Sequence, residues 1–208
     1  MYNNIIKSVL GWEIINKFIC YYNNKDREYN SRYLSSIHAI IITIISFYNC
    51  FINRILNQNM DMFFSLSLGY AIFDTYRALK KKETEFIIHH LIMIVSLFPI
   101  VLNYYNIFIL NHLYYYYISR AFLSESSTIF LNNCWLLIKE NKKSGIEFKI
   151  NSFMLIILFF LFRIVNFTNI IFSIYYTKYS MFLLLHIPLT ILNYIWFYKL
   201  IKKSITFF

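Results

Sequence analysis

Residues 85–96 read EFIIHHLIMIVS, where two adjacent histidines, His89 and His90, open a long apolar run. The run continues to about residue 103, which approaches the roughly 20 residues that a helix needs to cross a bilayer. Ionisable side chains inside a membrane are costly, and they tend to mark functional sites. The stretch therefore predicts a membrane-spanning helix with a candidate site on it.

The composition extends this pattern to the whole chain. Of its 208 residues, 59% are hydrophobic and only 14% are charged, whereas a soluble domain carries about 25% charged residues. The mean hydropathy is +0.51. No polar stretch is long enough to fold by itself. We therefore predict an all-α fold, a polytopic transmembrane helix bundle without a soluble domain.

Six apolar segments predict spans, and a further segment at residues 5–22 is open to two interpretations. Its charged residues, Lys7, Glu13 and Lys17, scatter around the helix instead of forming the single polar face of a surface helix. A seventh span is slightly favoured over an interfacial helix, so we expect six to seven spans. The six clearest spans are about 36–56, 62–79, 85–103, 112–136, 150–174 and 180–199.

The net charge of +10 reflects basic residues that gather in alternate connections between the spans. In a membrane protein this pattern sets orientation and attracts anionic lipid, so nucleic acid is not expected as a partner. The basic side, and with it the C-terminus, is predicted to be cytosolic. The basic segments lie near 25–32, 77–82, 139–149 and 199–203, and the nearly bare ones near 57–61, 104–111 and 175–179.

Polar side chains within the predicted spans are skewed toward the cytosolic leaflet, as judged at about 1.5 Å per residue. The skew predicts a cavity that opens to the cytosol and reaches a pair formed by Glu125 and Arg163 near mid-membrane. A purely structural ion pair that locks two helices is the simpler explanation of those two residues. The other polar side chains assigned to the cavity, or to structural contacts around it, are His38, Asp74 and Asn193.

Some of these side chains have simple structural explanations. Asp74 and Arg77 are three residues apart and are expected to pair on one helix face. His38 can serve only to hydrogen-bond a neighbouring helix.

The histidine pair carries the chemical hypothesis. Adjacent helical residues point about 100° apart, and no metal-binding spacing such as HExxH is present, so no metal site is expected. We expect one ring to face the cavity and the other to pack, hydrogen-bonded, against a neighbouring helix. A neutral imidazole in a cavity can act as a general base. Packing alone, for both His89 and His90, is the alternative.

A series of motifs resembles the TLC domain family, which includes translocating-chain-associated membrane proteins and ceramide synthases. The resemblance runs in order over residues 30–203, which leaves 1–29 as an N-terminal segment and 204–208 as a cytosolic tail. It implies a TLC-type multi-pass fold, in the endoplasmic reticulum or an equivalent internal membrane. The motifs are RYLSSIHA (32–39), GYAIFDTYR (69–77), EFIIHH (85–90), LSESSTIFLNNCW (123–135), FFLFRIVNF (159–167) and LNYIWFYKLIKK (192–203).

The resemblance implies two alternative functions. In ceramide synthases the paired histidines carry acyl transfer from acyl-CoA, and His89 and His90 match that pair. The acidic pattern of the synthases on the following span is absent, and a single Glu125 stands there, as in the small TLC-domain proteins concerned with membrane lipid composition. We therefore expect lipid binding in an intramembrane cavity, in lipid homeostasis, with acyl-CoA-dependent lipid acyl transfer as the alternative. Acyl-CoA is then a candidate co-substrate, and no resident cofactor is expected. Membrane lipid and a second copy of the chain are the candidate partners.

Overall fold

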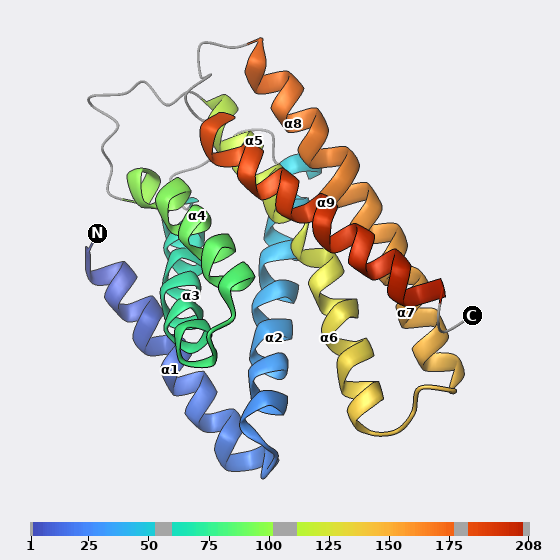
Figure 1. Cartoon of the computed structure of the whole chain (residues 1–208). Coiled ribbons are helices and arrows are strands. Elements are labelled where there is room, and N and C mark those ends of the chain that lie inside the picture. Colours follow the sequence, from blue (N-terminus) through green and yellow to red (C-terminus); the bar gives the residue numbers. More distant parts are fainter. Residues whose placement is uncertain (1, 53–59, 102–111, 177–182, 206–208) are drawn as a thin grey trace.

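The computed structural model describes residues 2–52, 60–101, 112–176 and 183–205, and within these ranges the regular structure is helical (Figure 1). Three predicted spans extend beyond the described residues: 36–56 beyond Ile52, 85–103 beyond Val101, and 180–199 before Leu183. The helices are α1 (Tyr2–Asn23), α2 (Arg27–Phe47), α3 (Met60–Lys81), α4 (Thr84–Val101), α5 (His112–Phe122), α6 (Glu125–Lys139), α7 (Ile146–Leu158), α8 (Asn166–Tyr175) and α9 (Leu183–Ile205). Two π-helical segments, Tyr48–Ile52 and Phe159–Val165, extend α2 and join α7 to α8.

Two of these helices are long and apolar enough to cross a bilayer by themselves. One runs over Arg27–Ile52, and the other runs without interruption through α7, the π segment and α8, over Ile146–Tyr175. A shorter apolar helix covers Thr84–Leu97, the stretch that holds the histidine pair. The all-helical prediction is therefore confirmed, while the number of spans stays a prediction.

Short turns fold the chain back on itself at one end of the bundle. Asn24, Lys82 and Asn141 adopt left-handed backbone conformations, with φ of 46°, 57° and 58°, which let the chain reverse direction within a few residues. At the first of these turns the Asp26 side chain accepts a hydrogen bond from the Tyr29 backbone N–H at 2.7 Å and caps α2. The connections α1–α2, α3–α4 and α6–α7 therefore lie on the same side of the molecule (Figure 1).

The span predicted over 112–136 is not one continuous helix, because the chain breaks between α5 and α6 at Leu123 and Ser124. The serines around the break explain it. Ser126 Oγ donates to the Leu123 carbonyl at 2.7 Å, and Ser127 Oγ donates to the Ser124 carbonyl at 2.8 Å. Serine hydroxyls that bond nearby carbonyls compete with regular helical hydrogen bonds. The break places Glu125 at the first position of α6.

The N-terminal segment forms a full helix that packs in the same bundle. Trp12 is 1% exposed, and its indole N–H donates to the Leu66 carbonyl of α3 at 3.1 Å. Ser8 Oγ donates to the same carbonyl at 3.1 Å. Gly69 lies directly beneath, since a Cβ on it would come within 2.5 Å of Ser8 Cβ. The missing side chain is therefore what lets α1 approach α3.

We expect Gly69→Ala to destabilise the protein by about 1–3 kcal/mol, because an added methyl group in a closely packed contact forces the two helices apart. The measurement is thermal unfolding in detergent. Gly11→Ala is the matched control, since a Cβ on Gly11 has no neighbour within 4 Å, and that change should be neutral or slightly stabilising. Equal unfolding temperatures for the two variants would contradict the proposed close approach.

Candidate functional site

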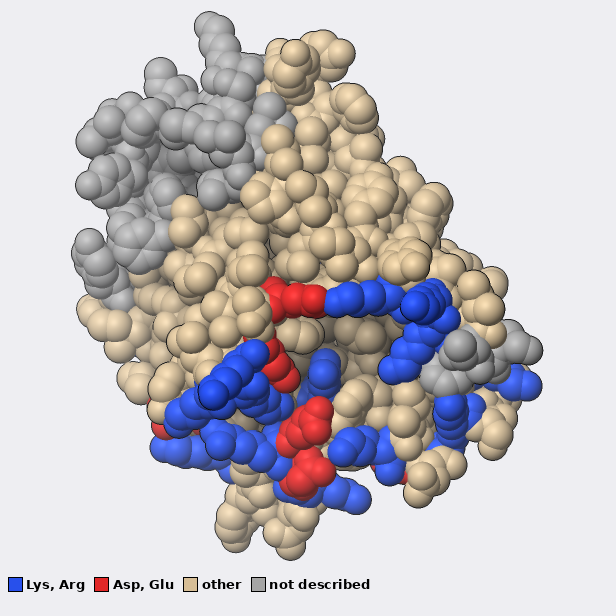
Figure 2. Space-filling view, viewed as in Figure 1, with Lys and Arg blue, Asp and Glu red and all other residues tan. Residues whose placement is uncertain are grey.

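A central cavity of about 270 Å³ lies among α2, α3, α4, α6, α7 with the π segment that follows it, and α9. Figure 2 shows a hollow on the viewed face of the molecule, rimmed by acidic and basic side chains. Its apolar lining comes from Phe86, Met93, Leu131, Leu155, Phe159, Trp196 and Leu200. Its polar lining comes from Arg32, Ser35, His38, Tyr70, Asp74, His89, His90, Glu125, Thr128, Asn132, Arg163, Lys199 and Lys203.

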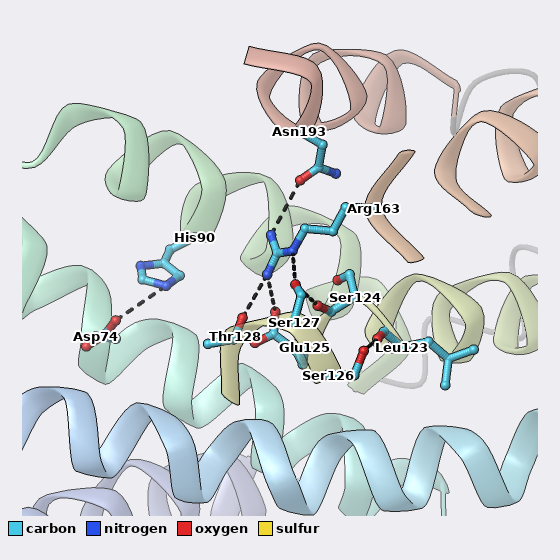
Figure 3. Close-up of polar contacts among 10 residues, drawn as sticks. All are labelled: Asp74, His90, Leu123, Ser124, Glu125, Ser126, Ser127, Thr128, Arg163 and Asn193. Atoms are coloured by element: carbon cyan, nitrogen blue, oxygen red, sulfur yellow. Dashed lines mark hydrogen bonds and ion pairs between the residues drawn. The ribbon is translucent and has the colours of Figure 1, made fainter. Parts of the chain in front are cut away.

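His90 faces a carboxylate that sequence reasoning did not assign to it. Its Nε2 lies 3.5 Å from Asp74 Oδ2 (Figure 3), and the imidazole is 5% exposed. Asp74 also pairs with Arg77 at 3.1 Å, as the spacing of three predicted. The sequence contained a signal for this contact, because α3 and α4 are joined by a tight turn, and Asp74 and His90 lie at similar distances before and after that turn. Antiparallel helices place such residues at the same level.

Both histidines of the pair line the cavity, and His90 also contacts Asp74 of the neighbouring helix α3. The His89 ring lies 5.6 Å from the Trp196 ring of α9 and 5.4 Å from the His90 ring. The cavity is lined by residues of both α3 and α9 as well as α4, so two α4 side chains that point in different directions both reach it. Each Nδ1 is buried without a hydrogen-bond partner among the described residues.

His38 joins the same wall through ring stacking. Its imidazole stacks on the Tyr70 ring, with 3.8 Å between centroids and 11° between planes, and Trp12 packs edge-on against both rings. His38 Nε2 has no hydrogen-bond partner within the described part of the chain, so the hydrogen bond expected to a neighbouring helix is not formed through this atom. The His38 ring is therefore held by packing, and its Nε2 atom is available to a ligand in the cavity.

Arg163 organises the deep end of the cavity (Figure 3). Its Nη2 lies 3.7 Å from Glu125 Oε1, which confirms the predicted pair. Asn193 Oδ1 of α9 accepts from Nη1 at 3.4 Å. Two hydroxyl groups that sequence reasoning missed, on Ser127 and Thr128, accept from Nε and Nη2 at 2.8 Å each. One guanidinium therefore ties α6 and α9 to the long helix that carries it.

The π-helical segment around Arg163 has a structural consequence. Its wider turn interrupts the regular α-helical pattern over Phe159–Val165, and π segments of this kind occur often at functional sites. Arg163 is 5% exposed. An arginine this deeply buried needs the acid and the hydroxyl groups that surround it.

Charged side chains border the other end of the cavity. Glu85, at the start of α4, accepts a hydrogen bond from the Trp196 indole at 2.7 Å. It also forms an ion pair with Lys199, and both partners are on α9. Arg32 of α2 donates to Asn132 of α6 at 3.4 Å. The described residues bring together no group of three or more His, Cys, Asp or Glu side chains that could hold a metal ion.

The chain matches the family model of the TLC domain over residues 28–202. The chain belongs to the TLC domain family. The match covers α2 to nearly the end of α9, and with it every residue that lines the central cavity except Lys203, which follows directly. Together with the long apolar helices, TLC membership indicates an integral membrane protein with a lipid-related function. Helix α1 precedes the TLC domain. No curated protein and no solved structure matches the chain.

Proposed function

We propose that this TLC-domain protein binds a membrane lipid in the central cavity, in the service of lipid homeostasis. The observation that carries the proposal is the composition of the cavity wall, where leucine and aromatic side chains surround buried polar groups. Ligand sites of this type combine apolar walls, which bind hydrocarbon, with a few polar groups that orient the ligand.

The imidazole nitrogen atoms strengthen the proposal. His38 Nε2, His89 Nδ1 and His90 Nδ1 are buried without a hydrogen-bond partner among the described residues. Each unsatisfied buried group costs roughly 1–3 kcal/mol. A ligand whose polar part bonds these atoms would recover that free energy, whereas a purely apolar ligand would not.

The test is lipid retention by the purified chain, measured by mass spectrometry after incubation with a membrane lipid extract. Met93 lines the cavity, so Met93→Trp is expected to displace the lipid. Leu91→Trp is the matched control, because Leu91 is 48% exposed on the outside of the same helix. Wild type and Leu91→Trp should retain the same lipid, and Met93→Trp should lose it. Equal retention by all three would contradict binding in the cavity.

Acyl transfer is the second candidate function, and the contact between His90 and Asp74 favours it. A carboxylate beside Nε2 stabilises the tautomer that carries its proton there, which leaves the lone pair on Nδ1 to act as a base. In the proposed reaction Nδ1 takes the proton of a lipid hydroxyl or amine as that group attacks the thioester of acyl-CoA. The tetrahedral intermediate then expels the coenzyme thiolate, which receives the proton, and the acylated lipid remains.

We also propose six to seven spans in an internal membrane, such as the endoplasmic reticulum, with the basic end and the C-terminus in the cytosol. Figure 2 supports this orientation, since lysine and arginine gather in the half of the molecule that holds the three described turns. Helix α1 supports the seventh span, because Ile6, Leu10, Ile14 and Phe18 form an exposed apolar stripe along it. A stripe of this kind suits contact with lipid.

The orientation predicts that a glycosylation acceptor inserted in the turn between α6 and α7, at residues 140–145, stays unmodified in cells. The physical reason is the positive-inside rule, which keeps lysine-rich connections in the cytosol. The same acceptor inserted at residues 104–111 is the positive control and should be modified. Glycosylation of the acceptor in the 140–145 turn, without glycosylation at 104–111, would show that the predicted orientation is wrong.

A further inference from the structure

A second hollow, of about 120 Å³, lies between α6, α7 and the C-terminal part of α9. We call it the side groove. Figure 1 shows α9 crossing α6 and α7 in this region. Its lining includes Leu131, Cys134, Phe148, Ser152, Leu155 and Leu200.

The side groove offers a ligand little besides hydrocarbon contact. Two of its polar groups, the Cys134 thiol and the Ser152 hydroxyl, face each other at 3.6 Å across α6 and α7. The hydrophobic residues around them form a core cluster in which Phe148 and Leu155 are buried. The other polar residues of the groove, Lys203 and Ser204, lie together near the C-terminal end of α9. Apolar surface is therefore the part of a ligand that gains most from burial between α6 and α7.

The side groove and the central cavity share part of their walls. Leu131, Leu155 and Leu200 line both, as does Lys203. The two hollows are therefore neighbours that share a leucine-lined boundary.

The polar groups are distributed unequally between the two hollows. The central cavity holds His38, His89 and His90, each with a buried nitrogen atom that has no partner among the described residues. None of these histidines lines the side groove. A polar cavity beside an apolar groove suits an amphiphile, which has a polar end and a hydrocarbon chain.

We propose that the side groove holds the hydrocarbon chain of a lipid whose polar end lies in the central cavity. This inference rests on the proposed lipid-binding function, and it assigns the hollow that holds each end of the ligand. Ser152 is then a specificity-determining residue, because its small side chain leaves room for the distal part of the chain.

The test uses fatty acids as probes, since each has one chain and one small polar end. Binding of decanoic, palmitic and arachidic acids to the purified full chain in detergent is measured for wild type and for Ser152→Phe. Each buried methylene contributes roughly fourfold in affinity, so blocking the groove should lower palmitate affinity at least about tenfold. Decanoate affinity should change much less, because its shorter chain extends less far.

Ser173→Phe is the matched control, because the same change is made on the same long helix, away from the side groove. A second readout uses wild type alone, so it does not depend on the folding of a variant. Palmitate with a photoreactive group at its terminal carbon should cross-link to peptides of α6 and α7 around Cys134 and Ser152.

Three results would overturn the inference. Unchanged chain-length preference in folded Ser152→Phe, or cross-links that map to the histidines of α4, would overturn the assignment of the groove while leaving lipid binding in place. No binding of any of the three fatty acids by wild type would overturn the proposed lipid binding together with it.

Discussion

Glu125→Gln is expected to lower the free energy of unfolding by about 3–5 kcal/mol, the usual cost of removing one partner of a buried ion pair. The change leaves the Arg163 guanidinium charged and enclosed. Ser127 and Thr128 would still accept its hydrogen bonds, but neutral hydroxyl groups do not balance its charge. The measurement is denaturant or thermal unfolding in detergent.

The double variant Glu125→Gln, Arg163→Gln separates charge from packing. It should be less destabilised than the sum of the two single variants, because neither charge is then left alone. Glu147→Gln is the control, since Glu147 is an exposed acid in the first turn of α7, and such surface changes usually stay within about 0.5 kcal/mol. Single and double effects that simply add would mean that the two residues are not coupled, despite their separation of 3.7 Å.

His90→Asn is expected to lower the rate of acyl transfer by about 10²–10⁴-fold, the usual loss when a general base is removed. His89→Asn should have a smaller effect, because the ring of His89 lies against Trp196 and only His90 faces Asp74. Asp74→Asn should also slow transfer, because the carboxylate that orients the imidazole is lost. The assay supplies labelled acyl-CoA and a mixed lipid extract to purified protein.

The same assay distinguishes the two candidate functions. Transfer by wild type that is lost in folded His90→Asn would support catalysis. No transfer by wild type to any lipid or to water, with the variants folded and lipid retention unchanged, would exclude catalysis under these conditions and leave lipid binding. Full activity in His90→Asn would show that another group takes the proton.

Sequence reasoning located six of the thirteen polar residues that line the cavity, because ionisable groups in apolar helices stand out. His38, His89, His90, Asp74, Glu125 and Arg163 all line one cavity. Asn193, the remaining predicted residue, contacts Arg163 from α9 without lining the cavity itself.

The unpredicted parts of the site depend on small polar side chains. Ser127 and Thr128 look like ordinary helix residues in the sequence, and only the position of Arg163 makes them ligands of its guanidinium. Serine hydroxyls also create the break between α5 and α6, and they do so through hydrogen bonds that hydropathy does not describe.

By itself the sequence determined the helical, membrane-embedded class of the fold and the candidate polar residues, because hydrophobic content and buried charge are properties of local composition. Tertiary structure alone decided which residues meet. The pairing of His90 with Asp74 depends on the turn at Lys82, and the approach of α1 depends on Gly69 lying beneath Ser8. The boundary between central cavity and side groove depends on how α9 crosses α6 and α7. Such contacts join residues far apart in the chain, and their geometry is set by the packing of whole helices.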